Sequence, residues 1–205
     1  MKISVILLDL GGILIELAGL KRMIELMKKE ITPDELSMRW LYSKYVRLYE
    51  SGRCSSEMFA ENIVKELDMD ITARDFLEEF PMYTKGFLPG AAELLQVLKQ
   101  KYTLACLSNT NIIQWNSLCE RISLDKYFHH SFLSFEMKKL KPEREIYTYV
   151  IKELGCAPGK IIFFDDNEDN VKAAVNTGMN AYQALGCADL KQKLETLNII
   201  CTGDI

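Results

Sequence analysis

The sequence of 205 residues has few of the side chains on which several common classes of site depend. It contains only two histidines, His129 and His130, and its six cysteines include no C-x-x-C pair. Because histidine and paired cysteines are the usual ligands of zinc, a zinc site is not expected. The cysteine spacing indicates no disulfide framework, so we expect reduced thiols in a cytoplasmic protein.

An excess of positive charge is also missing. The formal net charge of −4 argues against nucleic acid or an anionic membrane as the main partner. The longest apolar run, at the N-terminus, is interrupted by Asp9 and Glu16 and is preceded only by Lys2, which argues against a secretory signal. An apolar content of 48% and this length favour one large domain, or a core domain with a smaller insert.

Short continuous apolar runs that end in polar residues are typical of buried parallel strands. Three clear runs have this form, and two weaker ones follow later in the chain. The clear runs are residues 3–8, 103–107 and 160–164, and the weaker ones are residues 130–134 and 180–185. Helical patterns at residues 91–100, 143–154 and 169–177 alternate with them. The alternation predicts an α/β fold, a Rossmann-like doubly wound parallel sheet.

Residues 17–86 do not follow this alternation and contain no convincing strand. They show amphipathic helical patterns instead, at residues 20–30, 34–50, 56–67 and 73–80. We therefore expect an α/β core made of residues 1–16 and 87–205, with residues 17–86 as an inserted helical domain.

Polar residues follow the three clear apolar runs, and in a parallel sheet such residues meet beyond the carboxyl ends of the strands. They are Asp9, Ser108, Asn109, Asp165 and Asp166. Three carboxylates in one cleft need a cation, and oxygen ligands of this kind suit Mg²⁺. Lys141, just before Pro142, could join them, and Ser108 and Lys141 would then face an anionic group, for which phosphate is the obvious candidate.

Four motifs in this order carry a resemblance to a known family. They are LLDLGGIL at 7–14, LACLSNTN at 104–111, LKPEREIY at 140–147 and FFDDNEDN at 163–170. The chain resembles the haloacid dehalogenase superfamily, in the subfamily (IA) with a helical cap after the first strand. Within it, the chain is most similar to sugar-phosphate phosphatases of the α-D-glucose-1-phosphate phosphatase type.

The resemblance implies a Mg²⁺-dependent phosphatase in which Asp9 attacks phosphorus and forms an aspartyl-phosphate. The implied catalytic residues are Asp9, Ser108 and Lys141; the implied metal ligands are Asp9, the carbonyl of Gly11, Asp165 and Asp166; the implied substrate contacts are Ser108, Asn109 and Lys141. The expected substrate is a small phosphorylated metabolite, a sugar phosphate by resemblance. We expect a monomer or a weak homodimer.

One position departs from the pattern of the superfamily. Most of its phosphatases have a second aspartate two residues after the nucleophile, where it protonates the leaving group, but this chain has Gly11. General acid–base help is worth about 10²–10⁴-fold. Three interpretations stay open: a leaving group that needs no acid, such as an anomeric sugar oxygen; another group or a water in its place; or a protein with a non-catalytic role.

Rival functions follow from the same residues. A 2-haloacid dehalogenase would use Asp9 on carbon without a metal, and the adjacent Asp165 and Asp166 argue against it. A non-catalytic member would bind a phosphorylated ligand or a protein, and Gly11 is its only support. A phosphomutase would need an acid–base residue where Gly11 stands.

Two local features are also predicted. Asp169 is expected to cap the helix that follows the paired aspartates. Tyr42, Tyr45 and Tyr49 have helical spacing, which indicates a packed face first, with a contact from this region to the substrate as the functional alternative.

Overall fold

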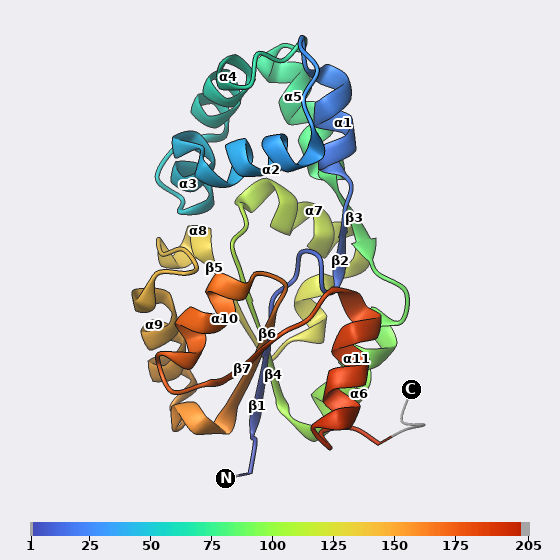
Figure 1. The fold of residues 1–205 in the computed structure, drawn as a ribbon, viewed down its shortest axis with the longest axis vertical. Coiled ribbons are helices and arrows are strands. Elements are labelled where there is room, and N and C mark those ends of the chain that lie inside the picture. The colour runs from blue at the N-terminus through green and yellow to red at the C-terminus, as the bar shows by residue number, and fades with distance from the viewer. Residues whose placement is uncertain (1, 202–205) are drawn as a thin grey trace.

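The computed structural model describes residues 2–201 and contains a five-stranded parallel sheet of order β5-β4-β1-β6-β7 (Figure 1). The strands are β1 (Val5–Leu8), β4 (Thr103–Ser108), β5 (His130–Leu133), β6 (Ile161–Asp165) and β7 (Asn180–Gln183). All five coincide with the predicted runs, and the predicted α/β fold is confirmed.

Strand β1 lies at the centre of the sheet because it is apolar on both of its faces. Val5 and Leu7 point into one hydrophobic cluster, and Ile6 and Leu8 point into the other. Such double burial is what a central parallel strand requires. The register pairs Leu8 with both Cys106 of β4 and Phe164 of β6, so the residues that follow β1 lie between the ends of these two neighbours.

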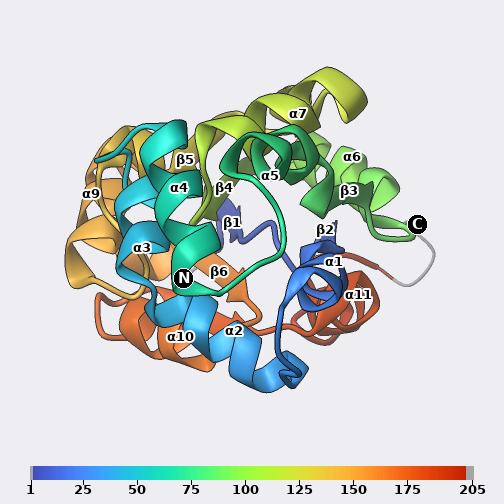
Figure 2. The same ribbon diagram turned by 90° about the horizontal axis from the view of Figure 1, so that it is seen from above.

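Helices cover both faces of the sheet, as Figure 2 shows from above. The helices α9 (Arg144–Leu154) and α10 (Glu168–Val175) pack on one face, and α6 (Ala91–Lys101), α7 (Ile112–Ile122) and α11 (Gly186–Thr196) on the other. Short helical segments complete this part: α8 (Ser134–Met137), η2 (Leu124–Tyr127) and η3 (Pro158–Lys160). The prediction that Asp169 caps α10 is wrong, because the Asn167 side chain accepts the hydrogen bond from the Asp169 N–H.

The inserted helices form a separate layer above the carboxyl ends of the strands (Figure 1). They are α1 (Gly19–Leu26), α2 (Pro33–Tyr42), α3 (Lys44–Glu50), α4 (Ser56–Glu66), α5 (Ala73–Glu79) and η1 (Phe80–Tyr83). An aromatic cluster fills their interior, in which Phe59 stacks on Tyr49 and also contacts Phe76 and Phe80. We call this layer the cap. Its exact boundaries at 16/17 and 86/87 stay a prediction.

Two expectations for the cap are wrong in detail. The single helix predicted over 34–50 is divided, because Ser43 adopts an extended conformation and begins a second helix. The expectation of no strand is wrong at both ends, because β2 (Ile15–Leu17) pairs with β3 (Thr84–Phe87) as an antiparallel ribbon that joins cap and core. A ribbon of two three- or four-residue strands is too short to show a hydrophobic period.

No disulfide joins any two of the cysteines in the part of the chain that the structure describes. Among residues 2–201, no helix combines the length and the apolar character needed to cross a bilayer.

Ser43 is a testable source of cap stability. Its hydroxyl accepts from the N–H groups of Tyr45 and Val46 and donates to Glu66, so it both caps α3 and ties it to α4. Ser43→Ala should lower the free energy of unfolding by about 1–2 kcal/mol, the usual cost of losing a helix cap. Chemical denaturation measures this loss. Ser37→Ala, on the exposed side of α2, is the matched control and should leave stability unchanged or slightly raised.

Candidate active site

Three carboxylates converge where the central strands end. Asp9 follows β1, and its N–H donates to the Phe164 carbonyl at 2.9 Å, which holds the turn against the end of β6. Carboxylate oxygens of Asp9, Asp165 and Asp166 lie within 4.8 Å of one another. The predicted convergence of these three residues is therefore seen in the structure.

Lys141 lies between two of these carboxylates. Its Nζ is 2.8 Å from Asp9 Oδ1 and 2.6 Å from Asp165 Oδ2, and its side chain is only 2% exposed. The Asn109 side chain holds the Lys141 backbone from both sides, because Oδ1 accepts from the Lys141 N–H at 2.9 Å and Nδ2 donates to the Lys141 carbonyl at 3.1 Å. Asn109 thus positions Lys141, a role that the sequence did not indicate.

Asp165 is fully buried and all of its hydrogen bonds are internal. Besides Lys141 on Oδ2, its Oδ1 accepts from the Asn167 N–H and from Asn170 Nδ2, both at 2.9 Å. The Tyr147 hydroxyl of α9 in turn donates to the Asn170 carbonyl at 3.0 Å. Asp165 is therefore the anchor of the loop, whereas Asp166 is only partly buried.

Gly12 allows Asp166 to approach Asp9. Its φ of +71° lies in the left-handed region, and a β-carbon at this position would lie 2.5 Å from Asp166 Oδ2. A side chain at residue 12 would therefore displace the Asp166 carboxylate. Gly11, for which a metal-ligating carbonyl was predicted, forms an isolated bridge with Ile15 in the same turn.

The site holds more negative charge than Lys141 balances. Burial raises the pKa of Asp9 to about 7, Lys141 opposes this rise, and repulsion from Asp165 adds to it. Burial and the charge of Asp165 also raise the pKa of Asp166. Burial alone would lower the pKa of Lys141, but Asp9 and Asp165 outweigh it and hold that pKa above its usual range. Asp9 and Asp166 thus have the donor atoms and the surplus charge to bind a hard divalent cation.

Ser108 lies at the end of β4 with 4% exposure, next to the turn that carries Asp9. Among the described residues 2–201, its hydroxyl makes only one long contact, 3.5 Å to the Asn109 carbonyl, so it has donor capacity left for a ligand. Of the tyrosines with helical spacing in the cap, Tyr49 is buried in the aromatic cluster and Tyr42 is exposed.

Two site residues have no signal in the sequence. Leu17 of β2 lies over Gly11, and Glu50 at the end of α3 interacts electrostatically with Lys141 and Asp9. Both lie far from the four motifs along the chain. The spacing of the tyrosines around Glu50 indicated a packed helix first, with a substrate contact from this region as the alternative, but it did not indicate Glu50 itself.

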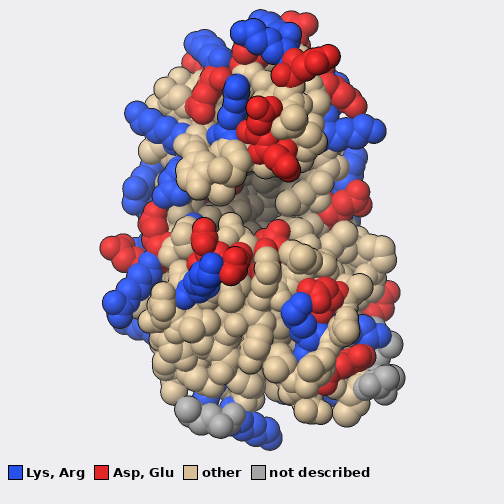
Figure 3. All heavy atoms as spheres, in the orientation of Figure 1, with Lys and Arg blue, Asp and Glu red and all other residues tan. Residues whose placement is uncertain are grey.

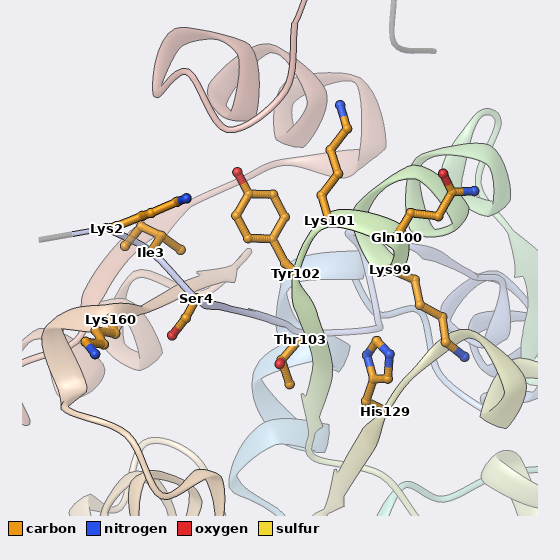
Figure 4. A pocket seen from close by; sticks show the side chains of 10 residues that line it. All are labelled: Lys2, Ile3, Ser4, Lys99, Gln100, Lys101, Tyr102, Thr103, His129 and Lys160. Atoms are coloured by element: carbon orange, nitrogen blue, oxygen red, sulfur yellow. The ribbon is translucent and has the colours of Figure 1, made fainter.

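Figure 3 shows the molecule hollowed between cap and core, above the carboxyl ends of the strands. A second hollow lies at the amino ends of the strands, and its lining includes His129 and the lysines Lys2, Lys99, Lys101 and Lys160 (Figure 4). It contains no carboxylate and is remote from Asp9, so the hollow beneath the cap is the candidate active site.

Comparison with known proteins agrees with this geometry. The family model of haloacid dehalogenase-like hydrolases matches residues 3–178, and the chain belongs to that family. A D-ribitol-5-phosphate phosphatase of Bacteroides thetaiotaomicron is 23% identical over 206 residues, covering 94% of this chain and 97% of the relative. A flavin mononucleotide hydrolase of Arabidopsis thaliana is 31% identical over 156 residues, covering 74% of this chain and 61% of the relative.

Among solved structures, a haloacid dehalogenase family enzyme from Bacteroides thetaiotaomicron, in complex with magnesium and inorganic phosphate, superimposes with a TM-score of 0.73. The two are 27% identical, and the match covers 89% of this chain and 94% of that one. The predicted superfamily is confirmed; the subfamily and the similarity to the α-D-glucose-1-phosphate phosphatase type stay predictions.

The raised pKa of Asp9 predicts how stability depends on pH in the absence of divalent cations. Its folded pKa of about 7 exceeds the ordinary value of 3.8, so between these values the folded state holds a proton that the unfolded state has lost. The stabilisation is complete below the ordinary pKa and is lost as the pH rises through 7.

In EDTA, the free energy of unfolding should therefore fall between about pH 5 and pH 8, and Asp9→Asn should reduce this fall by at least the ~1.4 kcal/mol of one pKa unit. Urea denaturation at several pH values measures both proteins. Other groups titrate in both proteins, so the difference between their two pH curves reports the contribution of Asp9. Parallel pH curves would contradict the raised pKa.

Lys141→Met should destabilise the protein strongly. It leaves the buried carboxylates of Asp9 and Asp165 without their cation, and removing one partner of a buried ion pair costs about 3–5 kcal/mol. Lys139→Met is the control, because the contacts of Lys139 are weak: its Nζ lies 3.5 Å from the Met137 carbonyl and 5.8 Å from the centre of the Tyr149 ring. Equal denaturation midpoints for the two variants would show that Lys141 is not the charge that holds the site.

Proposed function

We propose that this chain is a Mg²⁺-dependent phosphatase that hydrolyses a small phosphorylated metabolite through an aspartyl-phosphate at Asp9. The observation that carries the proposal is the grouping of one buried ammonium with three carboxylates at the carboxyl ends of the central strands. Similarity to enzymes named as phosphatases along nearly the whole chain supports it.

The donor set fits magnesium, which binds one or two carboxylates together with water and phosphate oxygens. Asp9, Asp166 and the carbonyl of Gly11 would hold the ion, and Asp165, whose oxygens are already bonded, would act through Lys141 and the loop. When bound, the ion would offset the repulsion between the anionic nucleophile and the anionic phosphate.

The residues of the chain would divide the remaining tasks. Lys141 holds Asp9 Oδ1, which orients the other carboxylate oxygen for attack on phosphorus. A bond forms between that oxygen and phosphorus while the bond to the leaving oxygen breaks. Ser108 and the ammonium of Lys141 would stabilise the charge on the phosphoryl oxygens. Water then attacks phosphorus and releases phosphate, which regenerates Asp9.

The names of the relatives narrow the substrate class. Ribitol 5-phosphate and flavin mononucleotide both carry a phosphate on the primary alcohol of a ribityl chain. We infer a polyol or sugar phosphate, bound in the hollow beneath the cap. Closure of the cap would exclude water and select the substrate. A cytoplasmic location and a monomeric or weakly dimeric state stay predictions.

Phosphate release from a panel of esters tests the function. The panel contains ribitol 5-phosphate, flavin mononucleotide, glucose 1-phosphate and glucose 6-phosphate, each with Mg²⁺ and with EDTA. Release should require Mg²⁺, and Asp9→Asn should lower kcat/KM by about 10³-fold or more, because the amide cannot replace the nucleophile.

Asp169→Asn is the matched control, since this exposed carboxylate belongs to the same acidic motif but lies on the first turn of α10. It should keep full activity. Release that persists in EDTA or in Asp9→Asn would contradict the mechanism. Binding of Mg²⁺ without turnover of any ester would favour the non-catalytic alternative, and metal-free release of halide from a 2-haloacid would favour the dehalogenase.

A further inference from the structure

Gly11 leaves the position of the usual general acid without a side chain, and the structure fills that space with a hydrocarbon. A β-carbon on Gly11 would lie 3.3 Å from Leu17 Cδ1 and 3.5 Å from Cδ2. Leu17 belongs to β2 of the ribbon and is itself 58% exposed. A side chain at residue 11 would therefore meet Leu17, and because residue 11 is glycine, a proton donor has to come from another residue.

Glu50 approaches from the cap. It is the last residue of α3, and its carbonyl oxygen accepts a hydrogen bond from Ser134 Oγ at 2.6 Å. Ser134 is a fully buried core residue directly after β5, and its hydroxyl also accepts from the Thr110 N–H at 2.9 Å. Thr110 lies two residues beyond Ser108. The backbone of Glu50 is thus fixed to the edge of the sheet that carries the site.

The chain on both sides of Glu50 is fixed to the core as well. Arg47 pairs with Glu143 at 2.8 Å, and Arg53 donates to the Lys138 carbonyl at 3.1 Å. These two core residues flank Lys141 in the sequence. Gly52 has a φ of +61°, and a β-carbon there would collide with a backbone carbonyl of the core. The end of α3 is therefore docked along the loop that carries Lys141.

The carboxylate of Glu50 has no structural partner. Within residues 2–201, its side chain makes no hydrogen bond and no ion pair with another residue, so it contributes nothing evident to folding. Burial raises its pKa to about 7, the positive charges of Lys141 and Arg47 oppose this rise, and the charge of Asp9 adds to it. Glu50 is only partly exposed, and ionisable groups whose pKa is shifted in this way concentrate at functional sites.

We propose that Glu50 is the catalytic acid of this enzyme, supplied by the cap in place of a side chain at residue 11. The assignment rests on the proposed phosphatase function. Glu50 stands at the end of α3, in the layer opposite Asp9 and docked against the loop of Lys141. If Asp9 attacks phosphorus in line from the core, the leaving group lies toward this layer. A primary alkoxide is a poor leaving group, so a ribityl phosphate would need such a donor.

The Glu50 carboxyl group alone accounts for both proton transfers of the reaction. As the bond between Asp9 and phosphorus forms, the bond from phosphorus to the leaving oxygen breaks, and that oxygen takes the electron pair and the proton of the Glu50 carboxyl. In the second half of the reaction, the Glu50 carboxylate removes a proton from water as the water oxygen bonds to phosphorus. The electron pair of the broken phosphorus–oxygen bond returns to Asp9, and Glu50 is protonated again.

The test compares two leaving groups in Glu50→Gln, Glu50→Asp and wild type. The esters are 4-nitrophenyl phosphate, whose phenolate leaves without a proton, and the best alkyl phosphate of the panel. Glu50→Gln should lower kcat for the alkyl ester by about 10²–10⁴-fold, the usual contribution of a general acid, and leave the aryl ester within a few-fold of wild type. Glu50→Asp should restore part of the alkyl rate.

The pH profile gives a second readout. For the alkyl ester, kcat of wild type should fall as the pH rises and Glu50, which faces Lys141 and Asp9 and shares α3 with Arg47, loses its proton. This alkaline limb should be missing in Glu50→Gln. Glu61→Gln, an exposed cap glutamate, is the control and should match wild type. The denaturation midpoint of Glu50→Gln should equal or exceed that of wild type, because no bond is lost.

If Glu50→Gln lowers kcat equally for both esters, or changes only KM, Glu50 is a substrate-binding residue and the proposal is overturned. No loss for either ester would also overturn it. If wild type hydrolyses neither ester, the phosphatase function itself fails, and if it cleaves only the aryl ester, the enzyme has no acid.

Discussion

The ammonium of Lys141, enclosed between Asp9 and Asp165, is the interaction on which the rest of the site depends. Taking an ammonium and two carboxylates out of water is expensive, and the cost is recovered only with short contacts and a full set of hydrogen bonds. The structure provides both, since Asn109 holds the Lys141 backbone and Asn170 completes the shell of Asp165. One cation thus fixes the ends of β1 and β6 and the loop before α9 in a single arrangement.

The same arrangement leaves an excess of negative charge, and this excess determines what the site can bind. Three carboxylates share one ammonium, and only Asp165 has all its oxygens engaged within the protein. Asp9 and Asp166 keep oxygens that are not engaged in this way, and burial and the charge of Asp165 raise the pKa values of both. A site with this excess of negative charge favours the binding of a divalent cation. The bound cation in turn favours the binding of an anionic ligand, because its positive charge offsets that of the ligand.

The core of the fold could be predicted from the sequence because its signals are local. Each strand is an apolar run that ends in a polar residue, and a parallel sheet brings these ends together. The break at Ser43 and the ribbon of β2 and β3 could not be predicted, since the first depends on packing against α4 and the second on pairing between residues about 70 positions apart. The same limit applies to the site. Asp9 and Lys141 belong to motifs, whereas Glu50 is brought there only by the docking of the cap.

Leu17 and Glu50 show how a cap can take over a task of the core. In most phosphatases of the superfamily that the chain resembles, nucleophile and acid stand two residues apart on one turn. Here that turn has Gly11, with Leu17 above it, and the carboxyl group is on the other layer of the molecule. A donor on the cap reaches the leaving oxygen only when the cap sits correctly over the substrate. Catalysis and recognition would then depend on the same contacts, those that hold α3 against the Lys141 loop. A substrate that disturbs this docking would bind less well and would also lack a proton donor for its leaving oxygen.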